Sequence, residues 1–214
     1  MKSQDKHIQK LIEEGEHQML DFKFEISDSK RIARSLAAFA NTDGGRLLIG
    51  VKDNGRIAGV RGEEEMYMVQ AAGELWCDPP VPCHMQSLRA EGRTVVIATI
   101  EPAVVRPVRA KMEDGRYCAF VRIADENIVA GPVQMELWRR EQQGTSAVFT
   151  FTDEQHQLLT ALSAHADGVT LGSFVRLSHL PRRKAVALLA DLITFGLVEE
   201  RFIDHRFRYA PVKG

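Results

Sequence analysis

Basic side chains, which hold the phosphates of nucleic acids in many proteins, cluster at three places in this sequence. The first cluster lies among short polar motifs near the N-terminus and consists of Lys23, Arg46, Lys52 and Arg56. The second combines a basic segment with a later strand residue and consists of Arg106, Arg109, Lys111 and Arg122. The third is the run Arg182, Arg183 and Lys184 near the C-terminus. Single surface lysines usually bind nothing, so only the clustering predicts phosphate-binding surfaces.

The whole chain carries no excess of basic charge. Its 214 residues include 28 Lys and Arg and 29 Asp and Glu, which gives a formal net charge of −1. A phosphate-binding surface must therefore be a local patch. No apolar stretch approaches the roughly 20 residues that span a bilayer. Residues 1–10 are polar and of mixed charge, unlike a secretory signal. We therefore expect a cytoplasmic protein with no membrane partner.

The cysteines do not predict a metal site. Cys77, Cys83 and Cys118 contain no CxxC pair. A zinc site built from Cys77, Cys83 and His84 would lack a fourth ligand at suitable spacing. We therefore expect free thiols.

A strand positions the first basic residue. Residues 20–25 alternate strictly between apolar and charged types, which predicts a β-strand. The residues expected to face a core are Leu20, Phe22 and Phe24. Asp21, Lys23 and Glu25 share the other face, where Asp21 would pair with a neighbouring lysine in solvent.

A helix and a turn follow this strand. Ser27 or Asp28 can cap the helix, and residues 41–45 end it because paired glycines allow positive φ. The expected core stripe of the helix is Ile32, Leu36, Phe39 and Ala40. A buried strand over 47–51 then leads into Asp53-Asn54-Gly55, a strong hairpin-turn sequence with a return strand at 57–60.

Further elements complete the N-terminal domain. We expect a helix over 63–76, a hairpin formed by 85–88 and 94–100, and a strand over 117–122. The pattern predicts an α+β fold with a mostly antiparallel sheet and crossing helices. Residues 1–140 are assigned to this domain and 141–150 to a linker.

Residues 151–214 predict a small winged helix-turn-helix domain. The pattern contains a helix over 153–166, a short helix up to 177, a longer helix from 181, and strands over 197–201 and 207–209. This order of elements is typical of winged helices. The third basic cluster then starts the recognition helix, where a DNA reader contacts the groove. Winged helices also serve as dimerisation surfaces, so both roles stay open.

Three motifs, in this order and spacing, resemble the Schlafen AlbA-like domain. They are EHQMLDFK at 16–23, AAFANTDGG at 37–45 and LIGVKDNGRIAGV at 48–60. The family is described as nucleic-acid binding, so the resemblance implies a DNA or RNA partner. The Schlafen relatives resemble two such lobes facing each other, whereas this chain has one lobe. The resemblance therefore implies a symmetric homodimer.

Some Schlafen relatives cut RNA with three carboxylates, and the resemblance places these catalytic, metal-binding residues at Glu16, Asp21 and Asp53. Such a trio can hold Mg²⁺ or Mn²⁺, which activates a hydroxyl or water and offsets phosphate charge. Asp21 stands where the relatives carry glutamate, so its side chain is one methylene shorter. A parallel crossover between the first two strands would also set Glu16 and Asp53 at opposite ends of the sheet. Taken alone, Asp53 is a turn former.

Three functions follow from these patterns. The leading hypothesis is a nucleic-acid-binding protein, a bacterial DNA-binding or transcriptional regulator that uses both domains. The alternatives are a metal-dependent endoribonuclease of the Schlafen type and a dimerisation or assembly module. A metal among the three carboxylates would favour the endoribonuclease, and a surface without a continuous basic channel would favour the assembly module.

Overall fold

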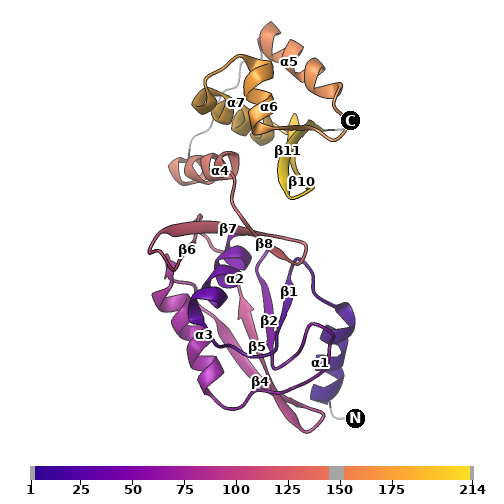
Figure 1. Ribbon diagram of the computed structural model, residues 1–214, viewed down its shortest axis with the longest axis vertical. Coiled ribbons are helices and arrows are strands. Elements are labelled where there is room, and N and C mark those ends of the chain that lie inside the picture. Colours follow the sequence, from indigo (N-terminus) through magenta and orange to yellow (C-terminus); the bar gives the residue numbers. More distant parts are fainter. Residues whose placement is uncertain (1–2, 145–151, 213–214) are drawn as a thin grey trace. The chain divides into compact units, whose positions relative to one another are not determined.

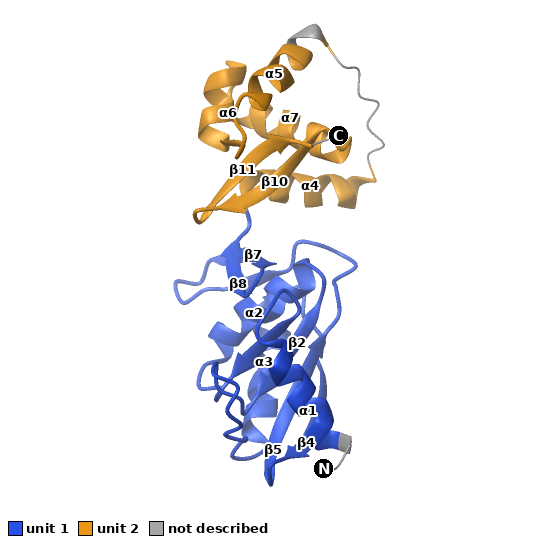
Figure 2. Ribbon diagram, turned by 90° about the vertical axis from the view of Figure 1, so that its right-hand side faces the viewer, with its two compact units in different colours: residues 1–130 blue, residues 131–214 orange. Residues whose placement is uncertain are grey.

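The computed structural model describes residues 3–144 and 152–212, which fold as two compact units, Met1–Ala130 and Gly131–Gly214 (Figure 2). The division falls earlier than residue 140 because the helix at 132–143 packs within the second unit. The expected linker thus begins inside this helix, and its residues 145–150 lie outside the described residues. Helices are combined with mostly antiparallel sheets, so the predicted α+β class is confirmed.

The first unit contains a four-stranded sheet in the order β1-β2-β5-β4 (Figure 1). Its strands are β1 (Leu20–Lys23), β2 (Gly45–Ile49), β4 (His84–Ala90) and β5 (Arg93–Ile100). β1 and β2 are parallel, whereas β5 is antiparallel to both β2 and β4. Helix α2 (Ser29–Asn41) connects β1 to β2. It returns the chain to the end of the sheet at which β1 begins, so that β2 can run parallel to β1.

Helices cover both faces of this sheet. The covering helices are α1 (Ser3–Glu14) on one face and α2 with α3 (Glu64–Leu75) on the other (Figure 1). Alternate residues of β2 divide between the two sides, since Leu48 packs with α1 while Leu47 and Ile49 pack with α2. The first three residues of β1, Leu20, Asp21 and Phe22, are therefore buried although they point to alternate faces.

Local signals explain helix α2. The Oδ1 atom of Asp28 accepts a hydrogen bond from the Lys30 amide at 2.8 Å, which caps the helix as expected. The whole predicted core stripe is buried: Ile32, Leu36, Phe39 and Ala40. After the helix, a Cβ atom at Gly45 would lie 2.4 Å from the Phe39 ring, so only glycine fits where β2 begins.

A second antiparallel sheet packs against α2. Its strands, in spatial order, are β3 (Cys77–Asp78), β6 (Arg109–Lys111), β7 (Tyr117–Ile123) and β8 (Glu126–Val129). The buried Asn41 at the end of α2 joins helix and sheet. Its Nδ2 donates to the carbonyls of Val108 and Phe120, both at 2.8 Å, and its Oδ1 accepts from the Val108 amide at 2.7 Å.

Residues 57–60 do not form the expected return strand. Only the single bridge between Val51 and Ile57 pairs the two arms. The amides of Ala58 and Gly59 both donate to the Gly50 carbonyl at 2.8 Å, which folds the returning chain across the end of β2. Gly50 has a φ of +93° there, a conformation that other residues rarely adopt.

The second unit follows the predicted order of elements, with one helix before them and a two-residue strand after the first of the predicted helices. It contains α4 (Pro132–Gln143), α5 (Asp153–Ser163), β9 (Val169–Thr170), α6 (Leu171–Ser178), α7 (Arg182–Thr194), β10 (Val198–Ile203) and β11 (Arg206–Pro211). The strands form an antiparallel sheet in the order β10-β11-β9. Its core includes Leu162, Phe174, Leu189 and Tyr209. In the described parts of both units, no helix is long and apolar enough to cross a membrane.

Candidate functional site

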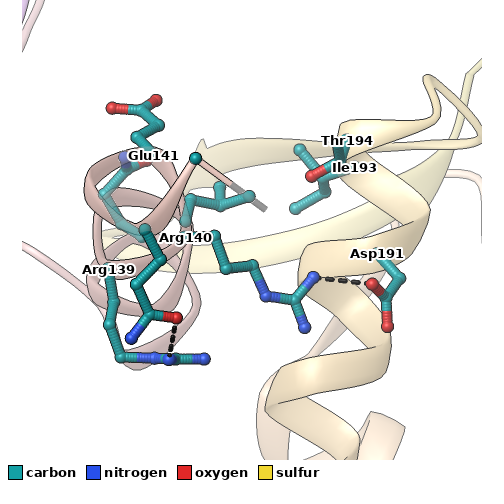
Figure 3. A pocket seen from close by; sticks show the side chains of 10 residues that line it. Arg139, Arg140, Glu141, Asp191, Ile193 and Thr194 are labelled. Atoms are coloured by element: carbon teal, nitrogen blue, oxygen red, sulfur yellow. Dashed lines mark hydrogen bonds and ion pairs between the residues drawn. The ribbon is translucent and has the colours of Figure 1, made fainter. Parts of the chain in front are cut away.

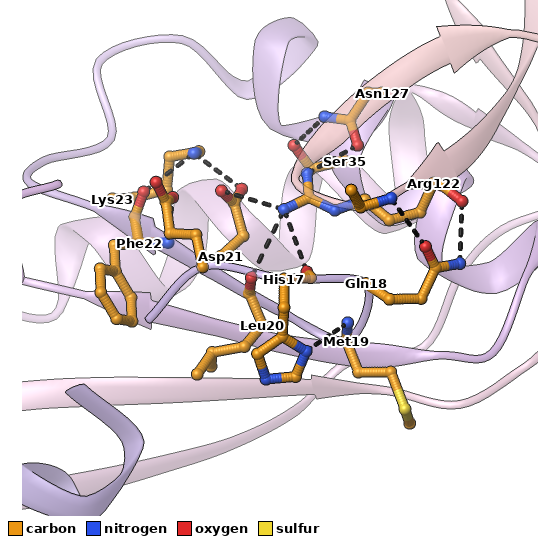
Figure 4. Close-up of polar contacts among 12 residues, drawn as sticks. His17, Gln18, Met19, Leu20, Asp21, Phe22, Lys23, Ser35, Arg122 and Asn127 are labelled. Atoms are coloured by element: carbon orange, nitrogen blue, oxygen red, sulfur yellow. Dashed lines mark hydrogen bonds and ion pairs between the residues drawn. The ribbon is translucent and has the colours of Figure 1, made fainter. Parts of the chain in front are cut away.

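Asp21 lies inside the first unit rather than on a solvent-facing strand surface. Its neighbours in β1, Leu20 and Phe22, pack toward α1, so Asp21 points to the opposite, equally covered face. Only 3% of the residue is exposed. Its Oδ2 lies 2.7 Å from the Lys23 Nζ, and its Oδ1 lies 3.4 Å from the Arg122 Nη2 (Figure 4). The expected lysine partner is present, but the expected exposure is wrong.

Arg122 is the second buried charge of this site. Its guanidinium lies 5.0 Å from the centroid of the Phe39 ring, and the residue is 2% exposed. Nη1 donates to Asn127 Oδ1 at 3.1 Å, and Nη2 donates to the Leu20 carbonyl at 3.4 Å (Figure 4). Arg122 was expected to hold phosphate. Its burial and its internal partners instead make it a bridge between β7 and β1.

Glu16 reaches Asp21 from the segment before β1. Its Oε1 accepts a hydrogen bond from the Phe22 amide at 2.9 Å, which fixes the carboxyl group beside the strand. Burial, and then a hydrogen bond with the Asp21 carboxyl, raise the pKa of Glu16 above its ordinary value. Glu16 and Asp21, two of the three carboxylates that the family resemblance singled out, therefore lie side by side.

Asp53 does not join this pair. It lies exposed in the turn after β2, where the Gly55 amide donates to the Lys52 carbonyl at 2.7 Å. Because β1 and β2 are parallel, Glu16 precedes one strand whereas Asp53 follows the other. Among the described residues, no group of three or more His, Cys, Asp or Glu side chains could hold a metal ion. The structure therefore does not bring Glu16, Asp21 and Asp53 together as a metal site.

A groove of about 650 Å³ opens beside the Asp21–Arg122 pair. Its walls come from β1, the first turns of α2, and β7 with β8. Lys23 lines it together with Arg31 and Arg34, which lie three residues apart on one side of α2. The sequence interpretation missed these two arginines, although their helical spacing could have indicated them. Acidic residues line the groove as well, namely Glu25, Asp28, Asp125 and Glu126, so its charge is mixed.

The rest of the first basic cluster does not gather at one point. Arg46 lies near the start of β2, with its Nη2 3.9 Å from Glu14 Oε2. Lys52 follows the other end of that strand, and its Nζ lies 4.8 Å from the ring centroid of the half-exposed Phe24. Phe24 was expected to face a core, and its 44% exposure corrects that prediction. Arg56 is exposed in the turn after Lys52.

The second basic cluster is divided by the second sheet. Arg109 and Lys111 flank the buried Ala110 in β6, so both project from the same face of that strand. Arg106 is half-buried in the loop before β6. Arg122, the fourth member, is the buried residue of β7 described above.

The third basic cluster lies where the sequence predicted. Arg182, Arg183 and Lys184 form the first turn of α7, and all three are exposed. None of them makes an ion pair with a described acidic residue, whereas Arg208 of β11 lies 3.7 Å from Asp204. These three residues form an exposed basic turn at the start of the helix.

A second cavity of about 730 Å³ lies between α4 and α7 in the second unit (Figure 3). Arg140 crosses it, with its Nη1 2.6 Å from Asp191 Oδ1 and its Nε 2.9 Å from Glu136 Oε1. Hydrogen bonds from Arg139 and from Arg140 lower the pKa of Glu136 to about 2. The Arg140–Asp191 pair holds α4 against α7, which explains why α4 belongs to the second unit.

Comparison with known proteins identifies the first unit. The family model described as Schlafen, AlbA_2 matches residues 16–130. A search of curated proteins finds no match. Among solved structures, the N-terminal domain of a Nitrosomonas europaea protein described as related to the ATP-dependent DNA helicase RecG is 23% identical. That alignment covers 57% of this chain and 89% of the other, with a TM-score of 0.45.

A second solved structure is the DIP2311 protein of Corynebacterium diphtheriae, which is 19% identical with a TM-score of 0.45. The alignment covers 74% of this chain and 37% of that protein, so this chain spans well under half of its length. Both structures are similar to this chain at low sequence identity. The family match covers more than half of the chain and includes the three motifs noted in the sequence. The chain therefore belongs to the Schlafen AlbA_2 family.

Proposed function

We propose that this protein binds nucleic acid and acts as a DNA-binding regulator whose second unit is a winged helix that contacts duplex DNA. The observation that carries the proposal is the exposed, unpaired run Arg182-Arg183-Lys184 at the start of α7. The order α5, α6, α7 and the β10–β11 hairpin supports α7 as the recognition helix and the hairpin as the wing. Membership of the Schlafen AlbA_2 family supports a nucleic-acid partner.

The position of these cations supports an anionic ligand. The N-terminal end of a helix carries partial positive charge, so each basic residue there costs roughly 0.3–1 kcal/mol of stability at low ionic strength. Three consecutive cations in this turn are therefore unfavourable in the free protein. A DNA phosphate at the same turn would be attracted by both the side chains and the helix end.

The wing extends the basic surface of the second unit. Its turn, Asp204-His205, has φ values of +51° and +54°, which is the backbone of a tight two-residue hairpin. The rings of Phe202 and Phe207 pack 5.1 Å apart across the two strands and stiffen the hairpin. Arg206 is exposed beside the turn, where a wing contacts the DNA backbone.

The triple variant R182A/R183A/K184A tests the proposal. We expect weaker binding to duplex DNA in fluorescence anisotropy and a shallower dependence of log K on log salt. The slope should fall by about 0.9 for each phosphate that the variant no longer neutralises. The matched control is K6A/K10A/R89A, which removes three exposed basic residues from the first unit. Equal affinity and equal salt slope for the two variants would contradict the proposal.

We also propose that the protein is a homodimer, as the family resemblance implies for a chain with a single lobe. Two winged helices related by a two-fold axis would read a palindromic site. Light scattering coupled to size-exclusion chromatography at micromolar concentration tests this proposal. A mass of 24.0 kDa, that of one chain, would contradict it.

A further inference from the structure

Strands β6 and β7 of the second sheet, together with the start of α2 and the end of α3, carry two aromatic rings and three cations that the functions above leave unused. This aromatic–cation cluster consists of Lys30, Trp76, Arg109, Lys111 and Tyr117. We propose that the cluster binds a single-stranded stretch of nucleic acid, with bases against the rings and phosphates at the cations. The proposal rests on the proposed nucleic-acid binding and deepens it, because it names an unpaired strand as the partner of the first unit.

Trp76 is fixed in place by its backbone. It ends helix α3, where its amide donates to the Ala72 carbonyl at 3.3 Å. Its own carbonyl accepts a hydrogen bond from the Lys111 amide at 2.8 Å. The side chain is half-buried and packs against the core around α2. The ring is thus held rigidly at the point where α3 meets β6.

Two lysines approach this ring from different elements. The Nζ of Lys30, in the first turn of α2, lies 4.9 Å from the Trp76 ring centroid. The Nζ of Lys111, in β6, lies 5.8 Å from the same centroid. Lys111 also lies 5.9 Å from the ring centroid of Tyr117, its direct partner in β7. One ammonium group therefore stands near both aromatic rings.

Within the described residues, no ion pair neutralises the cations of the cluster. Lys30, Arg109 and Lys111 make no ion pair with any described residue, in contrast to Lys23 with Asp21 and Arg116 with Asp114. Arg109 extends the row of positive charge along the same face of β6 as Lys111. The side chain of Tyr117 is open, since 46% of the residue is exposed. An anionic ligand with flat faces matches this combination of charge and exposure.

A single strand fits the cluster better than a duplex. Bases stack on exposed aromatic rings without regard to sequence, and nearby basic side chains hold the backbone phosphates. In a duplex the base faces are already stacked on one another, so Tyr117 would find no free face. An acidic peptide could meet the lysines but has no flat ring system to place on Tyr117.

The experiment uses the intrinsic fluorescence of the full chain. It contains two tryptophans, and Trp138 of the second unit is only 1% exposed, so Trp76 is the residue that a ligand on the second sheet would quench. The probes are an unpaired thymidine oligonucleotide of about 20 nucleotides, a duplex of equal length, and a poly-glutamate peptide. We expect the single strand to quench the emission of the wild type and not that of W76F.

Four variants measure the contribution of the rings and cations. We expect Y117A to lose about tenfold in single-strand affinity and Y117F to stay within about twofold, because phenylalanine keeps the stacking face. The control Y67A removes a tyrosine of α3 that is more exposed than Tyr117, at 66%, and should bind like the wild type. K30A/K111A should also lose at least about tenfold and flatten the salt dependence.

Two outcomes would overturn the inference: equal single-strand affinity for Y117A and Y67A, or equal quenching by poly-glutamate and by the oligonucleotide. Its failure is distinguishable from that of the proposed function. If the winged-helix proposal is wrong, R182A/R183A/K184A leaves duplex binding unchanged while Y117A still weakens single-strand binding. If only this inference is wrong, the triple variant weakens duplex binding while Y117A has no effect on any probe.

Discussion

The Asp21 carboxylate and the Arg122 guanidinium meet at 3.4 Å inside the first unit, with side-chain exposures of 5% and 1%. Asp21 belongs to β1 of one sheet and Arg122 to β7 of the other, so this ion pair joins the two sheets. Both side chains are almost completely shielded from solvent. Loss of one charge would therefore leave the other buried without compensation.

The first prediction is that Asp21→Asn destabilises the protein. Asparagine removes the charge that faces both Arg122 and Lys23, and a buried guanidinium without its counterion is costly. We expect the free energy of unfolding to fall by about 3 kcal/mol. Urea denaturation followed by circular dichroism measures the change. The control is Asp53→Asn in the exposed turn, expected within about 0.5 kcal/mol of the wild type. Equal stability of the two variants would show that the pair contributes nothing.

The second prediction concerns Glu16 and pH. A carboxyl group whose folded pKa is raised stabilises the fold below its unfolded pKa, near 4.5, and this contribution is lost as the pH rises through the folded pKa. Glu16→Gln keeps the oxygen that accepts from the Phe22 amide and removes the charge beside Asp21. We expect E16Q to equal or exceed the wild type in thermal stability at pH 7, with the difference shrinking toward pH 4. A difference that stays constant from pH 4 to 8 would contradict this.

The third prediction is that Asn41→Asp destabilises the first unit. Aspartate has no N–H to donate, so the carbonyls of Val108 and Phe120 lose their donor and face a buried charge. We expect a loss of about 3 kcal/mol in unfolding free energy, from several unsatisfied groups together. Asn54→Asp is the matched control, because its side-chain oxygen can still accept from the Arg56 amide in an exposed turn. A similar shift in urea midpoint for both variants would refute the role assigned to Asn41.

The fourth prediction concerns Glu136 in the second unit. Its pKa is lowered to about 2 by Arg139 and Arg140, so its contribution is present above the unfolded pKa of 4.5 and is lost as the pH falls through about 2. We expect Glu136→Gln to lose about 1 kcal/mol at pH 7 and to match the wild type near pH 2. The exposed Glu13→Gln serves as the control. The measurement is the free energy of unfolding of both variants from pH 2 to pH 7. The same pH dependence for Glu136→Gln and Glu13→Gln would disprove the role assigned to Glu136.

Local patterns in the sequence predicted individual elements well. The Asp28 cap and the stripe from Ile32 to Ala40 specified α2, because both signals act within one helix. The second hairpin formed as expected around Glu91-Gly92, whose positive φ values suit a tight turn. The helix was also predicted to start near 181, as α7 does, because Pro181 and the helical pattern that follows it are adjacent in the chain.

Relationships between distant segments could not be predicted in this way. Alternation in β1 showed that Asp21 faces away from Leu20, but not that a second sheet would cover that face. The burial of Arg122 depends on Phe39 and Asn127, which belong to different elements. The prediction of a return strand at 57–60 was wrong. With positive φ at Gly50 and Gly59, the chain folds across the end of β2 instead of running beside β2. The sequence analysis placed most of helix α4 in the first domain. The contact that holds it in the second unit, between Arg140 and Asp191, joins residues that lie far apart in the chain.

The position of α2 between two sheets has a consequence for synthesis on the ribosome. Strands β1, β2, β4 and β5 all precede residue 101, so the first sheet can assemble while the chain is still short. Until β7 and β8 emerge, the far side of α2 has nothing to cover it, and Ser35 and Asn41 lack the partners they later bind. A nascent chain or a truncated fragment that stops near residue 105 would therefore expose apolar surface and recruit chaperones. We therefore expect the shortest fragment of the first unit that folds by itself to extend through Val129.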